Sequence, residues 1–240
     1  MGRLKETDLA APITEHLEAC GWDVYKEVPC GSGVADILAV KDNKIWVVEL
    51  KRCLSLQLLD QAIDRHFKTH YVSIAVPMPK TSKPAITSIA VNTVLNSYGI
   101  GVFMVKTGRS QVIEVRKPDL FRDVRDKTIK KLLASLHPKM KKNIAGSTAG
   151  NRWTPWKEWR TNVQRIVKAN PGISPKEMVA RLPTLAPYRK SKNAMDAAVY
   201  YARNGLLGDV VVRKVKGRLK LYLIHMHLLC GGIGRRYRGR

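Results

Sequence analysis

The stretch of residues 34–52 constrains the fold more than any other part of the chain. Two apolar runs rich in β-forming residues flank the polar segment 41–44, which is the pattern of a β-hairpin. Asp42 and Asn43 tolerate the positive φ angles that a two-residue hairpin turn requires. A turn at these two residues fixes the register of every cross-strand pair, beginning with residue 41 opposite residue 44.

This register places Asp36 directly opposite Glu49, and directly opposed residues point to the same face. Lys51 lies two residues beyond Glu49 and shares that face. The neighbouring pairs, such as Leu38 with Val47, are apolar, so the strands belong in the centre of a covered sheet. An unpaired buried carboxylate is costly or takes up a proton. We therefore predict a hard cation, Mg²⁺ or Mn²⁺, bound by Asp36 and Glu49. The alternative is a buried ion pair between Lys51 and one carboxylate.

Residues 33–36 (Gly-Val-Ala-Asp) and, after twelve residues, 49–51 (Glu-Leu-Lys) resemble the signature of the PD-(D/E)xK nuclease superfamily. Their spacing is similar to that of archaeal Holliday junction resolvases, and alanine stands where the superfamily's name has proline. The resemblance implies that the Asp, the Glu and the main-chain carbonyl of Leu50 bind metal. It also implies that Lys51 orients or activates the attacking water.

An apolar stripe at helical spacing predicts a first helix that begins near residue 7 or 8 and ends at Gly21, with Pro12 in or near its first turn. Many nucleases of the superfamily carry a further metal-linked glutamate on this helix, and the candidates are Glu6, Glu15 and Glu18. The start of the chain resembles an uncharacterised bacterial PD-(D/E)xK-like phosphodiesterase family, which favours Glu6. The alternative is that all three are solvated surface charges.

The rest of the first half alternates helical and strand patterns, with helices expected at 54–70 and 84–98 and strands at 22–28, 72–76, 102–105 and 112–115. Such alternation predicts an α/β fold. The resemblance refines this to a restriction-endonuclease-like mixed sheet flanked by helices. It also suggests a role near the metal for Gln61, although Arg65 stands where the usual tyrosine would follow.

The charge of the chain predicts a polyanionic partner. Lys and Arg number 43 against 19 Asp and Glu, for a net charge of +24. Residues 1–150 hold 23 basic and 15 acidic residues, whereas residues 151–240 hold 20 and 4. The second part is therefore the expected main phosphate-binding surface, with double-stranded DNA as the partner.

Other compositional features narrow the setting. No apolar run reaches the length of a membrane span, so no membrane association is predicted. The first residues lack the pattern of a signal peptide, and the four cysteines show no metal-binding spacing. These features predict a cytoplasmic protein.

The pattern divides the chain into four parts. Residues 1–142 form the nuclease-like domain and end in a basic helix at 119–142, and residues 143–153 are a flexible linker of small residues. Residues 154–226 suggest three short helices and a hairpin about residues 216–217, which resemble a small C-terminal winged helix-turn-helix domain. Residues 227–240 are a basic tail that adds non-specific phosphate contacts.

In a winged helix-turn-helix the third helix enters the major groove, and the wing contacts the backbone. The predicted DNA-binding residues lie on that helix and on the hairpin: Lys190, Lys192, Asn193, Arg203, Arg213, Lys214, Lys216 and Arg218.

Three functional hypotheses follow. The first is a Mg²⁺-dependent DNA endonuclease, a hydrolase in which Asp36, Glu49 and Lys51 are catalytic. The second is a structure-specific nuclease that resembles Holliday junction resolvases and acts as a homodimer on branched DNA. The third is a catalytically silent DNA-binding regulator, which the intact set of three residues disfavours.

Overall fold

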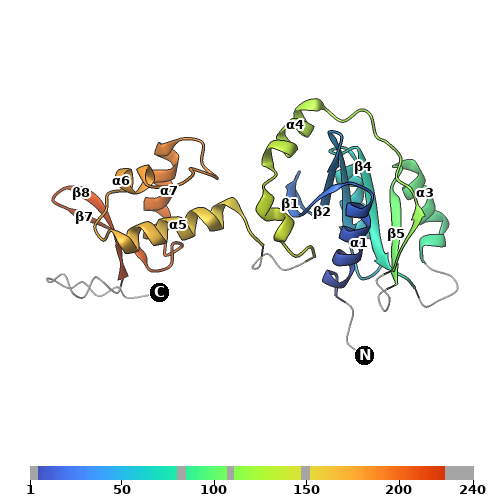
Figure 1. Ribbon diagram of the computed structural model, residues 1–240, viewed down its shortest axis with the longest axis horizontal. Helices are drawn as coiled ribbons and strands as arrows, with labels where there is room; N and C mark the ends of the chain where they lie inside the picture. The colour runs from blue at the N-terminus through green and yellow to red at the C-terminus, as the bar shows by residue number, and fades with distance from the viewer. Residues whose placement is uncertain (1–4, 80–84, 107–110, 147–151, 225–240) are drawn as a thin grey trace. The chain divides into compact units, whose positions relative to one another are not determined.

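The computed structural model describes residues 5–79, 85–106, 111–146 and 152–224 (Figure 1). The chain divides into two compact units, Met1–Arg152 and Trp153–Arg240. Within the described residues, no helix is both long and apolar enough to cross a membrane.

Six strands of the first unit form one mixed sheet in sequence order. The strands β3, β4 and β5 run parallel to one another, and the other neighbours are antiparallel. The predicted α/β class, a mixed sheet flanked by helices, is confirmed. The strands are β1 (Asp23–Cys30), β2 (Gly33–Lys41), β3 (Lys44–Leu50), β4 (Tyr71–Pro77), β5 (Gly101–Lys106) and β6 (Gln111–Arg116).

The β2–β3 hairpin has the predicted register, with Lys41 opposite Lys44 and Leu38 opposite Val47. Asp42 and Asn43 form the turn with φ angles of 49° and 60°. Two consecutive positive φ angles give a turn whose twist matches that of the strands, and Asp and Asn adopt them at low cost. The turn residues therefore determine which side chains reach each face of the sheet.

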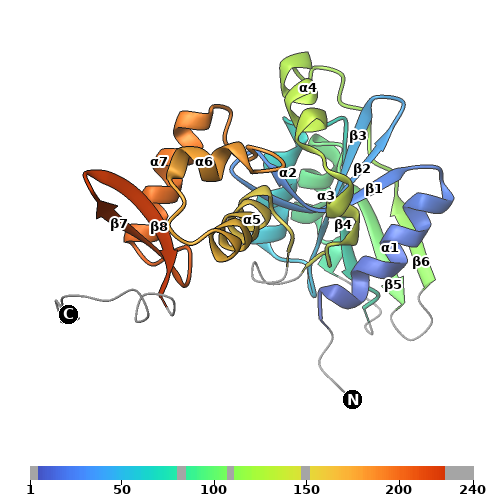
Figure 2. The ribbon, with the colours of Figure 1, turned by 60° about the vertical axis from the view of Figure 1, so that its left-hand side comes forward.

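Helix α1 (Thr7–Ala19) covers one face of the sheet, and α2 (Leu56–His66) and α3 (Ile89–Ser97) cover the other (Figure 2). A short 3₁₀ helix, η1 (Ala85–Thr87), precedes α3. Along β3, Val48 and Leu50 pack with α1, so the residues between and beyond them face the opposite side. Pro12 lies inside α1, later than its predicted place near the first turn.

The predicted basic helix at 119–142 is wrong. The segment is α4 (Asp126–Ser135) and the 3₁₀ helix η2 (Pro138–Lys142), preceded by chain without helix. Pro138 explains the break, because the residue before a proline is driven out of the helical region, and His137 has φ −135° and ψ 138°. Before α4, the Phe121 N–H donates to the carbonyl of His70 at 2.9 Å, which a continuous helix would not allow.

The predicted linker also begins too early. The side-chain amide of Asn143 donates to the carbonyl of Lys26 at 3.1 Å, and Ala145 is fully buried in the core. The Gly146 N–H donates to Glu27 Oε1 at 2.8 Å. Residues 143–146 are therefore part of the first unit, and residues 147–151 of the predicted linker lie outside the described residues.

The second unit contains its elements in the predicted order: α5 (Pro155–Ala169), α6 (Pro175–Ala180), α7 (Ser191–Arg203), β7 (Val210–Val215) and β8 (Arg218–Leu223). Thr154 caps α5, accepting from the Lys157 N–H at 3.2 Å, and Ser174 with Glu177 forms a capping box on α6. A core of its own surrounds the buried Trp159. Its assignment as a winged helix-turn-helix stays a prediction, and the tail 227–240 lies outside the described residues.

Candidate active site

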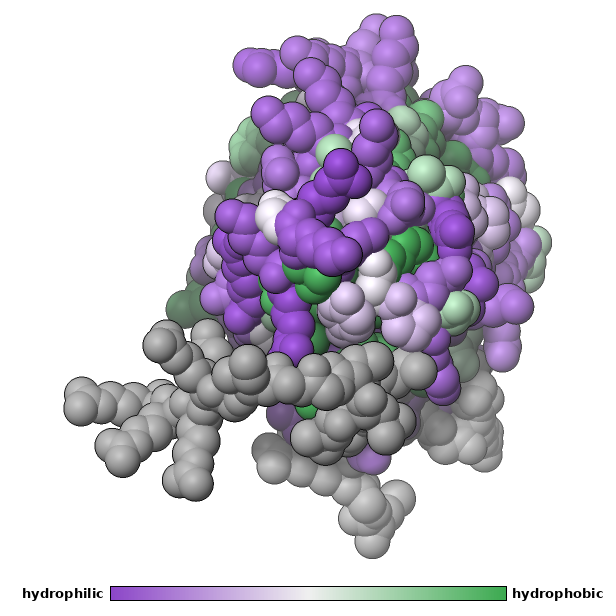
Figure 3. All heavy atoms as spheres, turned by 90° about the vertical axis from the view of Figure 1, so that its left-hand side faces the viewer, coloured by the Kyte–Doolittle hydropathy of each residue, from purple (hydrophilic) through white to green (hydrophobic). Residues whose placement is uncertain are grey.

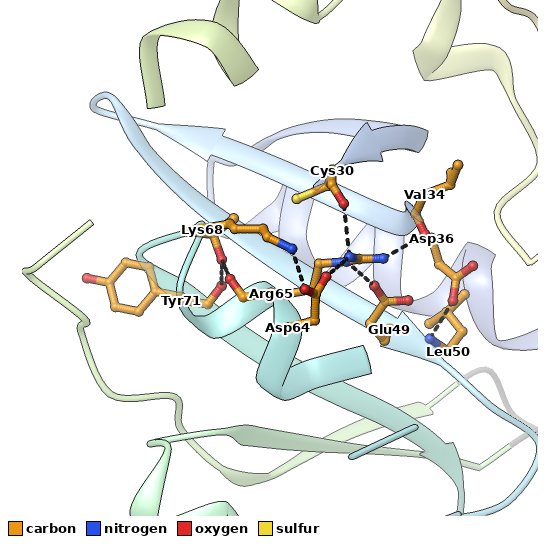
Figure 4. Close-up of polar contacts among 10 residues, drawn as sticks. Cys30, Val34, Asp36, Glu49, Leu50, Asp64, Arg65, Lys68 and Tyr71 are labelled. Carbon is orange, nitrogen blue, oxygen red and sulfur yellow. Dashed lines mark hydrogen bonds and ion pairs between the residues drawn. The ribbon is translucent and has the colours of Figure 1, made fainter. Parts of the chain in front are cut away.

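Asp36 lies near the start of β2, opposite the end of β3, and its Oδ2 accepts a hydrogen bond from the Leu50 N–H at 2.8 Å (Figure 4). Burial raises the pKa of Asp36, while the Leu50 N–H and the charge of Lys51 act in the opposite direction. The backbone of β3 thus holds one oxygen of this carboxylate. The proposed metal contact of the Leu50 carbonyl stays a prediction.

Glu49 is 1% exposed and forms a buried ion pair with Arg65, with 2.7 Å between Glu49 Oε1 and Arg65 Nε. Burial raises the pKa of Glu49 to about 7, and the nearby charge of Asp36 adds to the rise. Arg65 acts against it. The alternative prediction was a buried ion pair between Lys51 and one of the carboxylates. The structure instead pairs the buried Glu49 with Arg65.

Arg65 also binds the backbone around the site. Its Nη1 donates to the carbonyl of Cys30 at 2.9 Å and its Nη2 to the carbonyl of Val34 at 3.2 Å. Nη1 lies 2.5 Å from the carboxylate of Asp64. One side chain of α2 thus connects the β1–β2 turn with Glu49 on β3, as Figure 4 shows.

The sequence interpretation missed this role of Arg65 and treated the residue as a departure from a family pattern. A signal was present in the sequence, because Arg65 follows Leu58 and Ala62 at helical spacing. The structure buries all three residues. An arginine on the apolar stripe of a helix requires a buried acid as its partner.

Lys51 and Glu6 meet at the same edge of the sheet. Lys51 Nζ lies 3.5 Å from Glu6 Oε2, and the two side chains are 22% and 26% exposed. The charge of Glu6 acts to raise the pKa of Asp36. Glu15 and Glu18 are exposed on α1. Of the three candidate glutamates, Glu6 is therefore the one that the structure brings to the site, and its role as a metal ligand stays a prediction.

Gln61 has a side-chain oxygen that no atom of the described residues contacts by a hydrogen bond. Its Oε1 is buried and has no hydrogen-bond partner among the described residues. Gln61 lies one helical turn before Arg65, on the same face of α2 and toward the start of the helix. A buried amide oxygen of this kind can accept a hydrogen bond from a water or a ligand.

The donor set fits Mg²⁺ or Mn²⁺. The second oxygen of Asp36 and of Glu49 is not needed by Leu50 or Arg65, and Mg²⁺ is commonly held by one or two carboxylates while keeping several waters. The described part of the chain contains no group of three or more His, Cys, Asp or Glu residues arranged for a metal. A closed structural zinc site is therefore not found in that part.

All eight predicted DNA-binding residues are exposed in the second unit, four of them in or beside α7 and four on the β7–β8 hairpin. Figure 3 looks onto this unit and shows hydrophilic side chains over most of its face. Lys220, which also lies on the hairpin, has its Nζ 3.8 Å from a carboxylate oxygen of Glu177. The predicted residues thus share the solvent-facing position that phosphate contacts require, and their role stays a prediction.

Comparison with known proteins adds little. No family model and no curated protein matches the chain. Among solved structures, SfsA of Pyrococcus furiosus in complex with Ca²⁺ is 15% identical, with 45% of this chain and 59% of that chain covered and a TM-score of 0.29. A protein of unknown function, AF1548, is 11% identical, with 84% and 98% covered and a TM-score of 0.29.

The raised pKa of Glu49 predicts how metal-free stability depends on pH. The folded protein keeps a proton that the unfolded chain releases between the ordinary pKa of 4.5 and about 7. The contribution of Glu49 to stability is therefore present below pH 4.5 and is lost as the pH rises to about 7. In a chelator, the melting temperature of the wild type should fall relative to that of Glu49→Gln as the pH rises from 4.5 to about 7.

Glu15→Gln is the matched control, because it makes the same change at an exposed position of α1 and should follow the wild type at every pH. Parallel melting curves for the wild type and Glu49→Gln would contradict the assignment.

Proposed function

We propose that the first unit is a metal-dependent DNA endonuclease that hydrolyses phosphodiester bonds. The observation that carries the proposal is the convergence of Asp36, Glu49, Lys51 and Glu6 at one edge of the sheet. Buried acids placed side by side destabilise a fold unless a positive charge offsets them. A divalent cation bound between them provides that charge.

The residues of the chain have distinct roles in this proposal. Asp36 and Glu49 would hold the cation, and a divalent cation bound there would supply Lewis-acid chemistry to the phosphodiester and to a water. The Leu50 N–H orients Asp36, and Arg65 orients Glu49, so that each carboxylate is fixed before substrate arrives.

Lys51 differs from Arg65 in that its amine is partly exposed and paired loosely, at 3.5 Å, with Glu6. It is therefore free to position or deprotonate the attacking water, or to stabilise the negative charge that develops on the phosphate. Glu6 keeps the amine at the site when DNA is absent.

The second unit supplies duplex binding in this proposal. It contributes most of the excess charge, and its exposed basic residues lie on the third helix and on the hairpin that follows. A silent DNA-binding regulator would explain this surface but not the gathering of Asp36, Lys51 and Glu6 beside the ion pair of Glu49 with Arg65. We therefore favour the endonuclease.

Substitutions at the site test catalysis. Asp36→Asn and Lys51→Met should each slow Mg²⁺-dependent DNA cleavage by at least roughly a hundred-fold, because each removes a charge that acts on the reacting phosphate. Removal of divalent ions by a chelator should abolish cleavage by the wild type. Lys44→Met, which removes an exposed lysine at the hairpin turn, is the control and should cleave normally.

The assay should include linear duplex, flap and four-way junction DNA, so that the preferred substrate is measured directly. DNA binding by each variant in a chelator shows that lost cleavage does not reflect lost binding. Cleavage by both Asp36→Asn and Lys51→Met at the wild-type rate would show that the assigned site is wrong.

Substitutions in the second unit test DNA binding. Lys192→Ala on α7 and Arg213→Ala on β7 should weaken duplex binding in a chelator and flatten its salt dependence by about 0.9 for each lost phosphate contact. Lys168→Ala removes an exposed lysine from the last turn of α5 and should leave the slope unchanged. Unchanged slopes in both test variants would contradict the role of this surface.

A further inference from the structure

Helix α4 is held as an arch beside the β1–β2 hairpin (Figures 1 and 2). Before the helix, the Phe121 N–H donates to the carbonyl of His70, and the Phe121 ring packs against the ring of His66 with 4.2 Å between centroids. After the helix, Lys141 forms an ion pair of 2.5 Å with Asp23 on β1. The segments before and after α4 (residues 121–141, called the arch) are therefore both attached to the sheet of the first unit.

A cavity of about 500 Å³ lies under the arch, between α4, the β1–β2 turn and the end of α2. Pro29 and Leu132 contribute apolar surface to it, and four basic side chains line it: Lys68, Arg125, Lys127 and Lys131. This size suits a ligand of one or a few small groups, and a double helix is far too wide to enter.

The basic residues of the cavity outnumber their acidic partners. Lys68 pairs with Asp64. Arg125, Lys127 and Lys131 form no ion pair with any carboxylate in the part of the chain that the structure describes. Like charges gathered around one hollow repel one another and create a positive potential inside it, which an anion relieves.

The helical repeat of α4 gives the cavity its lining. Lys127 and Lys131 are four residues apart and share one face, together with Leu132 and Ser135. Lys130 is exposed on the same helix but does not line the cavity. Two neighbouring lysines therefore differ in their relation to the cavity while having the same charge.

Gly31 leaves room for Lys68 at the cavity wall. Its φ is +66°, and a Cβ at this position would overlap the Lys68 ammonium and lie 2.7 Å from Lys68 Cδ. A side chain here would push Lys68 out of place. The tight glycine turn between β1 and β2 thus allows a cationic side chain to lie against the backbone.

One side chain connects the cavity with the candidate active site. Cys30 lines the cavity, and its carbonyl accepts from Arg65 Nη1 at 2.9 Å. The same guanidinium binds Glu49 through Nε at 2.7 Å. Arg65 therefore links the wall of the cavity directly to the buried Glu49.

We propose that the cavity under α4 binds the sugar-phosphate backbone of a single nucleic-acid strand next to the candidate active site. Lys127, Lys131 and Arg125 bind the phosphates, and the apolar surface of Leu132 contacts the sugars. The inference rests on the proposed function for its substrate class, nucleic acid, and not for cleavage.

The test measures binding of a short fluorescent single-stranded oligonucleotide to the full chain by anisotropy, in a chelator so that no cleavage occurs. Lys131→Ala should weaken binding several-fold and flatten the salt dependence by about 0.7, the value for one phosphate contact with a single strand. Lys130→Ala is the matched control, one residue away with the same charge change, and should bind like the wild type. Lys127→Ala should act like Lys131→Ala.

A second measurement locates the strand. An oligonucleotide with a photoreactive base should crosslink to residues of the cavity in the wild type, and the adduct should be lost in Lys131→Ala but kept in Lys130→Ala. Equal weakening by Lys130→Ala and Lys131→Ala would overturn the proposal, as would a crosslink that falls only in the second unit. Competition by a nucleoside monophosphate as effective as that by the oligonucleotide would also overturn it, in favour of a free nucleotide.

The endonuclease proposal and the strand-binding proposal can be tested independently. Asp36→Asn should slow cleavage as described above and leave the binding of the single strand in a chelator unchanged. Lost binding in Lys131→Ala with normal cleavage of short duplexes would support the cavity without bearing on the catalytic residues.

Discussion

The buried guanidinium of Arg65 is the interaction on which the site depends. It is 3% exposed, pairs with the almost fully buried Glu49, and donates to the carbonyls of Cys30 and Val34. Removing one partner of a buried ion pair costs about 3–5 kcal/mol, because the other charge is left uncompensated. Arg65 therefore fixes the position of Glu49 and the shape of the β1–β2 turn together.

The alternation of side chains along β3 then separates packing from chemistry. Val48 and Leu50 belong to the core under α1, whereas Glu49 faces the helix that carries Arg65. At the adjacent edge, Asp36 and Glu49 lie close together and Glu6 pairs with Lys51. These carboxylates leave excess negative charge over Arg65 and Lys51 when all are ionised. This excess is the physical reason to expect a cation, and the basic arch of α4 beside it is the reason to expect an anionic strand.

Local patterns in the sequence were enough to predict the hairpin, because Asp42 and Asn43 adopt their turn without help from the rest of the fold. That register correctly brought Asp36 toward the end of β3. The family resemblance favoured Glu6 as a metal-linked glutamate; the structure pairs Glu6 with Lys51, and its role toward a metal stays a prediction. The ion pair of Arg65 with Glu49 was not predicted, and neither was the position of α4 and η2 beside the β1–β2 hairpin. Both depend on contacts between residues far apart in the chain, such as Phe121 with His70, which no local periodicity records.

The central claim is that Asp36 and Glu49 share a divalent cation. A crystal soaked in Mn²⁺ and measured at the manganese absorption edge tests this most directly, because anomalous scattering locates the ion without relying on activity. We predict a peak within bonding distance of both carboxylates in the wild type and its loss in Asp36→Asn. Absence of a peak at that place in the wild type, with Glu49 still paired to Arg65, would contradict the account.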